Sequence, residues 1–187
     1  STKGWIPTND IANALTPFFP QTQKAIFAFG YSNANVNTKN LVNSSGVVAA
    51  DATGVGTARQ GTRGVSYGGD KAIISWGNGY VTTTNLVNNS GVVAADAGGA
   101  GTGRQSPAAA QYGNDKALFA FGQIDGGLTA ASNLVSNQGV ISSDVTASGT
   151  TKTETAGAQY GADLAIVWGG SAGSTMYNHR NLISNVG

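Results

Sequence analysis

The feature that most constrains the fold of this chain is a fourfold internal repeat. A short apolar segment that ends in glycine occurs at residues 24–30, 71–77 and 116–122, and more loosely at residues 164–170. The copies are almost evenly spaced along the chain. Even spacing with a period of about 40–50 residues is typical of architectures in which one supersecondary unit stacks on the next. We therefore predict a single domain, residues 1–187, made of four units that start near residues 24, 71, 116 and 164.

Two further elements recur in the units. An Asn-Leu-Val or Asn-Leu-Ile segment follows each copy, at Asn40, Asn85, Asn133 and Asn181, and three of the four continue through a glycine to an aspartate. A basic residue then stands eight positions before a Tyr-Gly pair, at Arg59, Arg104 and Lys152. Each unit thus offers about four short apolar segments separated by Gly, Asn and Ser. This punctuation is typical of strands and turns and not of helices, so the chain is predicted to be all-β.

Four strands in every such period match one blade of a β-propeller. The segment from Leu164 to the C-terminus and the segment before Lys24 are each about half a period long, and together they supply one further period. The arithmetic predicts a four-bladed β-propeller in which one blade is closed by the N- and C-terminal segments. Such closure would hide strand edges that otherwise promote aggregation.

Residues 1–23 fit the repeat least well and leave two interpretations open. In the first, they are a degenerate closing strand pair; in the second, they are an arm that docks on another subunit. The segment from Asn9 to Leu15 resembles a capped helical turn that ends before Pro17. The apolar residues of the candidate docking arm are Trp5, Ile11, Leu15, Phe18 and Phe19.

The aromatic residues divide into three groups. Those on the recurring apolar segment are expected in the core: Phe27, Phe29, Trp76, Phe119, Phe121 and Trp168. The tyrosines of the Tyr-Gly pairs, Tyr67, Tyr112 and Tyr160, are expected to pack between units with their hydroxyl groups bonded. A third group lies in loops where the units stop resembling one another. Because these loops join equivalent strands, they should cluster on one rim, and a candidate binding surface there contains Tyr31, Tyr80, Asp125 and Tyr177.

The basic residue, the Tyr-Gly pair and the following Asp-Lys-Ala-Ile segment resemble a kelch-type repeat, although only Gly169-Gly170 has that family's double glycine. Residues 85–104 are more similar to Gly/Ala/Asn-rich repeats of structural proteins of tailed bacteriophages. This resemblance covers all of the chain but the N-terminal segment. It implies a virion protein, assembled in the host cytoplasm and extracellular in the free particle, whose partners are other capsid or tail proteins.

Composition excludes several function classes. A formal net charge of +1 gives no basis for binding nucleic acid or an anionic membrane surface. No apolar run approaches the roughly 20 residues needed to cross a bilayer, so no membrane insertion is expected. The chain has no cysteine, which excludes disulfides and thiolate metal sites.

The repeated charged residues favour structure over chemistry. Asp51, Asp96 and Asp144, like Asp70, Asp115 and Asp163, recur once per unit and are predicted to form turns, with repeated calcium sites as the alternative. Arg59, Arg104 and Lys152 either hold unit to unit or form an anion-binding ring. His179 is the only histidine and is expected in a surface turn. The Gly-rich residues 98–103 lack the setting of a phosphate loop. We predict no catalytic residue, no metal and no cofactor, and therefore no enzyme.

Two functions remain. The first is a non-enzymatic bacteriophage virion protein, serving as a capsid decoration or a tail-associated module. The second is a carbohydrate-binding lectin or the receptor-binding module of a fibre, with a host-surface glycan as its partner. Exposed tyrosines on the rim would suit the second, because sugar rings stack on aromatic faces.

Overall fold

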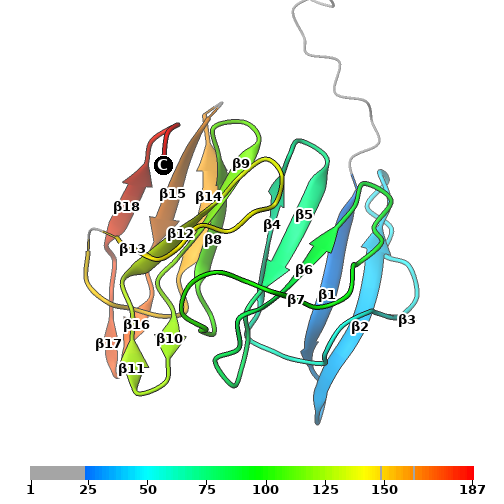
Figure 1. Ribbon diagram of the computed structural model, residues 1–187, viewed down its shortest axis with the longest axis horizontal. Coiled ribbons are helices and arrows are strands. Elements are labelled where there is room, and N and C mark those ends of the chain that lie inside the picture. The colour runs from blue at the N-terminus through cyan, green and yellow to red at the C-terminus, as the bar shows by residue number, and fades with distance from the viewer. Residues whose placement is uncertain (1–23, 148, 162) are drawn as a thin grey trace, which may run out of the picture.

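The computed structural model describes residues 24–147, 149–161 and 163–187, and the docking-arm residues therefore lie outside the described part. Eighteen strands and no helix are found there, which confirms the all-β prediction. The strands form several small antiparallel sheets. These sheets follow one another in chain order, from β1 and β2 at the right of Figure 1 to β18 at the left.

The four larger sheets are the structural units of the chain. Their bounds are shifted from the predicted repeats that start near residues 71, 116 and 164, because the first strand of each later sheet precedes that residue in the chain. The first unit (residues 24–53) contains β1 (Ala25–Tyr31), β2 (Asn35–Val42) and β3 (Ala52–Thr53), in that order across the sheet. The second unit (residues 54–98) is a four-stranded meander of β4 (Arg63–Tyr67), β5 (Lys71–Ser75), β6 (Thr83–Val87) and β7 (Ala97–Gly98).

The third unit (residues 99–147) has the same meander, formed by β8 (Ala108–Tyr112), β9 (Lys116–Ala120), β12 (Ala131–Val135) and β13 (Val145–Thr146). A two-stranded hairpin of β10 (Gln123–Ile124) and β11 (Gly127–Leu128) extends from it. The fourth unit (residues 149–187) contains β14 (Ala156–Tyr160), β15 (Leu164–Trp168) and β18 (Arg180–Ile183), with a hairpin of β16 (Ser171–Ala172) and β17 (Thr175–Met176).

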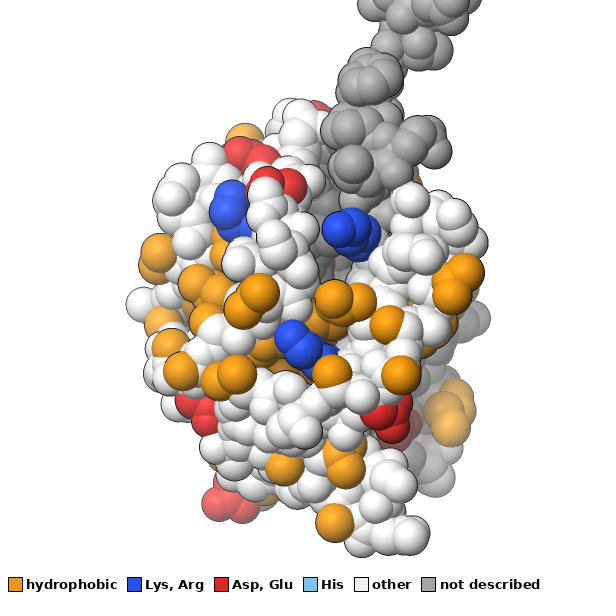
Figure 2. Space-filling view, turned by 90° about the vertical axis from the view of Figure 1, so that its right-hand side faces the viewer, with side chains coloured by type: hydrophobic (Ala, Val, Ile, Leu, Met, Phe, Trp, Pro, Cys, Tyr) orange, Lys and Arg blue, Asp and Glu red, His pale blue; other side chains and the backbone are white. Residues whose placement is uncertain are grey.

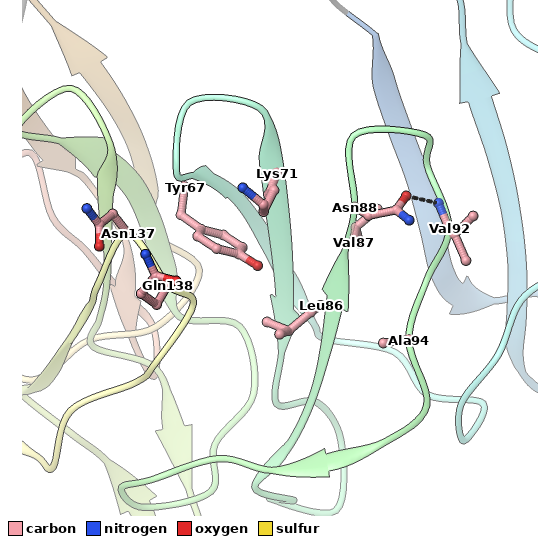
Figure 3. A pocket seen from close by; sticks show the side chains of 9 residues that line it. All are labelled: Tyr67, Lys71, Leu86, Val87, Asn88, Val92, Ala94, Asn137 and Gln138. Atoms are coloured by element: carbon pink, nitrogen blue, oxygen red, sulfur yellow. Dashed lines mark hydrogen bonds between the residues drawn. The ribbon is translucent and has the colours of Figure 1, made fainter.

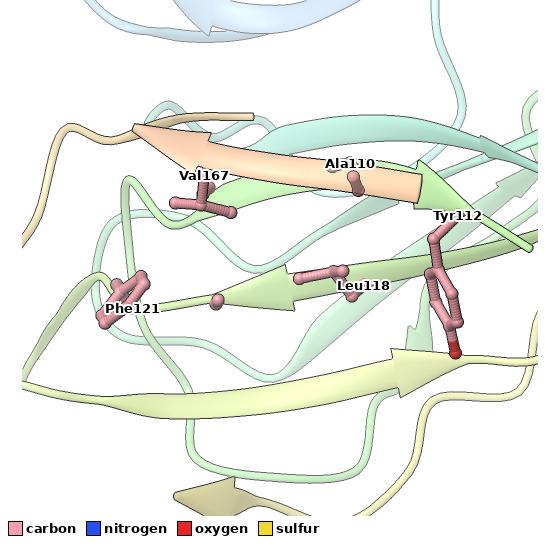
Figure 4. Close-up of a cluster of buried hydrophobic side chains, with 8 residues drawn as sticks. Ala110, Tyr112, Leu118, Phe121 and Val167 are labelled. Atoms are coloured by element: carbon pink, nitrogen blue, oxygen red, sulfur yellow. The ribbon is translucent and has the colours of Figure 1, made fainter. Parts of the chain in front are cut away.

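Side chains that alternate between the two faces of the second strand of each meander form the core. Successive side chains of a strand point to opposite faces, so one set meets the preceding unit and the other meets the following unit. In the third unit, Leu118 and Ala120 pack against Ala165 and Val167 of the fourth unit. Figure 4 shows part of this cluster, including Ala110 and Tyr112, which both belong to β8. The hydrophobic core is therefore a series of layers between units.

The core prediction is correct for four of the six aromatic residues and wrong for two. Trp76, Phe119 and Phe121 are buried and Phe29 is half-buried, whereas Phe27 is 63% exposed and Trp168 is 50% exposed. Phe27 lies at the position of buried Ile74 and Phe119, on the face of the first unit that no described unit covers. Trp168 lies at the position of buried Ser75 and Ala120, on the outer face of the fourth unit. Both exceptions arise because the four units form a row, in which the first and the last unit each have one face that no other described unit covers.

The first strands of the last three units are rich in small residues, which lets their backbones come close. A Cβ atom on Gly157 of β14 would overlap the carbonyl oxygen of Ala109 in β8. A Cβ atom on Gly64, the equivalent residue of β4, would lie 3.5 Å from the nearest atom, on Ile74. The two glycines thus occupy the same place in the repeat but differ in the space around them.

Gly157→Ala is expected to lower the free energy of unfolding by about 1–3 kcal/mol, the usual cost of forcing extra atoms into a packed interior. Gly64→Ala is the matched control. It should be neutral or slightly stabilising, because alanine restricts the unfolded chain. Urea denaturation followed by tryptophan fluorescence measures both. Equal effects for the two variants would contradict the close contact between β8 and β14.

Candidate functional site

The most highly organised polar residues lie at the junctions between units. Arg59, Arg104 and Lys152 are each at most 2% exposed. Arg59 donates from Nη2 to Oδ1 of Asn85 at 2.5 Å and from Nε to the carbonyl oxygen of Trp76 at 2.8 Å. Arg104 makes the equivalent bond to Asn133, and Lys152 donates to Oδ1 of Asn181 at 3.0 Å.

Each basic group also covers an aromatic ring of the preceding unit. The guanidinium carbon of Arg59 lies 4.1 Å from the ring centroid of Phe29, and that of Arg104 lies 4.0 Å from the ring of Trp76. Nζ of Lys152 lies 4.5 Å from the ring of Phe121. These are cation–π distances in a desolvated setting, where the attraction is strongest. Each basic side chain therefore binds its own unit by hydrogen bonds and the preceding unit by its ring contact.

The rings occupy a strained backbone position. Phe29, Trp76 and Phe121 have φ values of 64°, 60° and 62°, in the left-handed region that favours glycine. In the fourth unit the equivalent residue is Gly169, with a φ of 68°. The conformation thus recurs in all four units, and the aromatic ring is present only where a basic residue of the following unit covers it.

In the second and third units, asparagine and aspartate extend this network within the unit. Nδ2 of Asn85 donates to Oδ1 of Asp96 at 2.9 Å, and Asp96 also accepts bonds from the amide and hydroxyl of Thr57. Asn133, Asp144 and Thr102 repeat this arrangement one unit later. The prediction that these aspartates form local turns is wrong, because their partners are up to 42 residues away in the chain.

The second set of aspartates also forms hydrogen bonds between distant parts of a unit. Asp70, Asp115 and Asp163 accept bonds from Asn89, Asn137 and Asn185 respectively, each within its own unit. Of the two interpretations of the basic residues, the one in which they hold unit to unit is confirmed. The anion-binding ring is wrong, because the three basic side chains are at most 2% exposed and therefore present no ring of charge to solvent. Among the described residues, no cluster of three or more His, Cys, Asp or Glu side chains could hold a metal ion.

The charges at the junctions are shifted by their surroundings. Burial, opposed by the nearby Asp144, lowers the pKa of Arg104 to about 10, so this side chain remains a cation at neutral pH. The hydrogen bonds from Thr57 are the largest cause of a lowered pKa at Asp96. At Asp144, desolvation is the largest single influence and acts upward, but the bonds from Thr102 and Asn133 together with Arg104 outweigh it, and the pKa is lowered.

Acid should therefore weaken the polar network within the second and third units. A carboxylate whose pKa is lower in the folded state stabilises the fold above its unfolded pKa of about 3.9, and this contribution disappears as the pH falls through the folded pKa. We expect the urea midpoint to fall steeply below about pH 4. The double variant Asp96→Asn, Asp144→Asn should be less stable at pH 7 and should lose less on acidification. An unchanged acid slope in that variant would contradict the assignment.

Sequence reasoning missed the asparagines and threonines of this network. The signal was available, because the Asn of each Asn-Leu-Val/Ile segment recurs in all four units and Thr-X-Arg occurs at Thr57 and Thr102. What the pattern could not supply was their distance in space. Asn85 lies 26 residues after Arg59 in the chain, and only the closed meander brings the two together.

The four rim candidates lie in the loops that follow equivalent strands. Tyr31 ends β1 and is exposed, Tyr80 lies in a turn after β5, and Asp125 lies between β10 and β11. Tyr177 follows β17 and stacks on His179, with ring centroids 5.2 Å apart. The β10–β11 and β16–β17 hairpins and the β1–β2 connection lie at the lower edge of Figure 1.

Two open cavities lie elsewhere in the described part of the chain, and neither is lined by a rim candidate. One, of about 350 Å³, lies between the second unit and the turn at Asn137 and Gln138 of the third (Figure 3). Its walls include Leu86, Lys71 and Tyr67, and burial raises the pKa of Tyr67. The other, of about 390 Å³, lies beside β4, β8 and β14. The first cavity presents mainly apolar surface, and Lys71 at its wall is paired with Asp70 at 3.0 Å.

Among the described residues, no helix is long and apolar enough to cross a membrane. Comparison of the chain with protein-family models and with curated proteins finds no match.

Proposed function

We propose that this chain is a non-enzymatic structural protein of a tailed-bacteriophage particle, serving as a capsid decoration or a tail-associated module. The observation that carries the proposal is the use of the repeated charged residues. Arg59, Arg104 and Lys152 are buried, and each is bonded to its own unit and covers a ring of the preceding one. A chain whose recurring charged side chains join its units is suited to a stable structural role. The resemblance of residues 85–104 to phage structural repeats supplies the setting.

Within this proposal the units act as propeller blades. Two features support that role: the second and third sheets are four-stranded meanders, and β8 lies against both β4 and β14. Blades of this kind are arranged about a common axis with their first strands innermost. The four-bladed ring, with one blade closed by the N- and C-terminal segments, stays a prediction, because residues 1–23 lie outside the described part of the chain.

Quantitative mass spectrometry of purified particles tests the proposed function. The number of copies of this chain is measured against the major capsid protein. A fixed simple ratio is expected, with hundreds of copies for a head decoration and a few to a few dozen for a tail module. Absence of the chain from particles, or a ratio that varies between preparations and falls on further washing, would contradict the virion role.

A carbohydrate-binding function is the second candidate, favoured by the exposed ring of Tyr31 and by the stacked pair of Tyr177 and His179 on the loops of one edge. A glycan array probed with the whole chain tests it. Binding that is lost in Tyr31→Ala or Tyr177→Ala and retained in Val145→Ala, an exposed residue of β13 outside these loops, would support a lectin. No binding to any glycan would remove this candidate and leave the structural role intact.

A further inference from the structure

The two ends of the row each resemble one side of an internal junction. At each internal junction, a glycine in the turn after the third strand of a meander packs against a leucine of the preceding unit. A Cβ atom on Gly91 would lie 2.5 Å from Leu41, one on Gly139 3.0 Å from Leu86, and one on Gly187 3.0 Å from Leu134. Tyrosines join the later two contacts, with Tyr67 beside Gly139 and Tyr112 beside Gly187.

One of the turn glycines, and one of the leucine–tyrosine pairs that such glycines contact, lack this contact among the described residues. Gly46 is the equivalent turn glycine of the first unit, and no described atom lies within 4 Å of the position of its Cβ. At the other end of the row, Leu182 is 61% exposed and Tyr160 is 39% exposed, whereas the equivalent Tyr67 and Tyr112 are each 2% exposed. The unoccupied turn and the uncovered pair of side chains are therefore complementary.

The apolar surfaces around these residues match in the same way. Val93 is buried, and it packs with Ile74 against Ile26 and Ala28 of the preceding unit. The equivalents of Ile74 and Val93 in the first unit are Phe27 and Val48, and both are exposed. The fourth unit exposes Trp168 on the face that corresponds to Ala28. Figure 2, which views the first-unit end of the row, shows hydrophobic side chains spread over that surface.

We propose that a second copy of this chain docks head to tail, with the first unit of one copy seated on the fourth unit of the next. This contact would repeat a junction that the chain already forms three times. Within one copy the first and last sheets lie at opposite ends of the row (Figure 1), so a single chain in this arrangement presents both faces outward. Docking of a second copy is the alternative to a four-bladed ring closed within one chain, because either arrangement would cover these same two faces. A head-to-tail contact uses two different surfaces, and therefore propagates into a ring or a filament of copies.

The residues that form the other junctions identify the contacts. Gly46 of one copy packs on Leu182 and Tyr160 of the next, and Phe27 and Val48 cover the surface at Trp168. The contact at this junction is mainly apolar, because the aromatic position that a basic residue covers elsewhere is occupied by Gly169. Association should accordingly depend weakly on salt and strongly on Leu182 and Trp168.

Cysteine pairs test the proposal directly, since the natural chain has no cysteine. Val47, next to Gly46, and Leu182 are replaced in separate chains, Val47→Cys and Leu182→Cys, which are mixed and treated with a short bismaleimide. The internal control is Leu41→Cys with Val92→Cys in one chain, across the equivalent first junction. The control should give an internally linked monomer, and the mixture should give covalent dimers.

A chain carrying both Val47→Cys and Leu182→Cys distinguishes docking of a second copy from closure of a ring within one chain. A ladder of dimers, trimers and larger species supports docking of a second copy. An internally linked monomer, with no dimer from the mixture, would overturn the proposal in favour of a ring closed within one chain. No linkage at either site, while the internal control reacts, would overturn the pairing of the two faces altogether.

Sedimentation of the cysteine-free chain provides a second measurement. Concentration-dependent growth in mass is expected, and Leu182→Glu should abolish it without lowering the urea midpoint, because the side chain is exposed in the single copy. Exposed Val140→Glu is the control and should leave association unchanged. This inference does not depend on the virion role: self-association of a chain that is absent from particles would refute the proposed function and leave the docking faces in place.

Discussion

Replacing Arg104 by alanine is expected to lower the free energy of unfolding by about 3–5 kcal/mol, the usual consequence of removing one partner from a buried, hydrogen-bonded pair. The side chain is fully buried at the junction between the second and third units. Without it, Oδ1 of Asn133 loses its donor, Asp144 loses the cation 3.7 Å away, and the ring of Trp76 loses the group that covers it. Denaturation in urea, followed by circular dichroism, measures the loss.

Arg104→Lys is the informative control, because Lys152 fills the same position at the next junction. Lysine retains a cation over the ring and one bond to the asparagine, so the conservative variant should recover a large part of the stability. Arg180→Ala, at an exposed position in β18, controls for the loss of a positive charge alone and should have little effect. If Arg104→Ala were as mild as Arg180→Ala, the junction network would not be a principal source of stability.

Trp76→Ala should be destabilising by about 3–5 kcal/mol, the range for truncating a large buried aromatic residue. Trp76 is fully buried, and its ring meets Phe119 edge-on at a centroid distance of 4.8 Å. Its backbone φ of 60° adds a second effect. Alanine inherits the left-handed conformation with its steric cost of about 1–2 kcal/mol, whereas glycine does not.

We therefore expect an unusual order of stability among the variants at Trp76. Trp76→Gly is expected to be more stable than Trp76→Ala, although glycine removes one more carbon atom. Trp76→Phe should be the mildest, because Phe29 and Phe121 occupy the equivalent positions and because the buried Nε1 of Trp76 has no hydrogen-bond partner. The urea midpoints of the three variants decide this. A glycine variant less stable than the alanine variant would contradict the claim that this position is strained.

The repeat predicted much of the fold because periodicity constrains every unit at once. The spacing of the Lys-Ala-Ile segments and the glycine-rich punctuation were sufficient to predict strands and turns. Burial at the ends of the row could not be read in this way. Phe27 and Trp168 belong to the same recurring segment as buried Phe119, and their exposure depends on which neighbour is present. A repeat pattern describes an average unit, and the first and last units are not average.

The polar residues show a second limit of the sequence. Arg59, Arg104 and Lys152 were recognised as recurring, and one of the two roles considered for them is the role they have. Their acceptors were not recognised, because the asparagines lie 26 or 29 residues further along the chain. For the rim, the sequence places Tyr31, Tyr80, Asp125 and Tyr177 in divergent loops. Divergence alone does not say what such loops bind, and the binding surface stays a prediction.

The row of units is held together by basic residues that each join their own unit to the preceding one. A double-mutant cycle between Arg104→Ala and Trp76→Ala tests this claim most directly, because the two residues belong to different units and meet only at the junction. A coupling energy of at least about 1 kcal/mol is expected, as for a desolvated cation–π contact. Additive effects, equal to within about 0.5 kcal/mol, would show that the two side chains stabilise their units independently and would contradict the account.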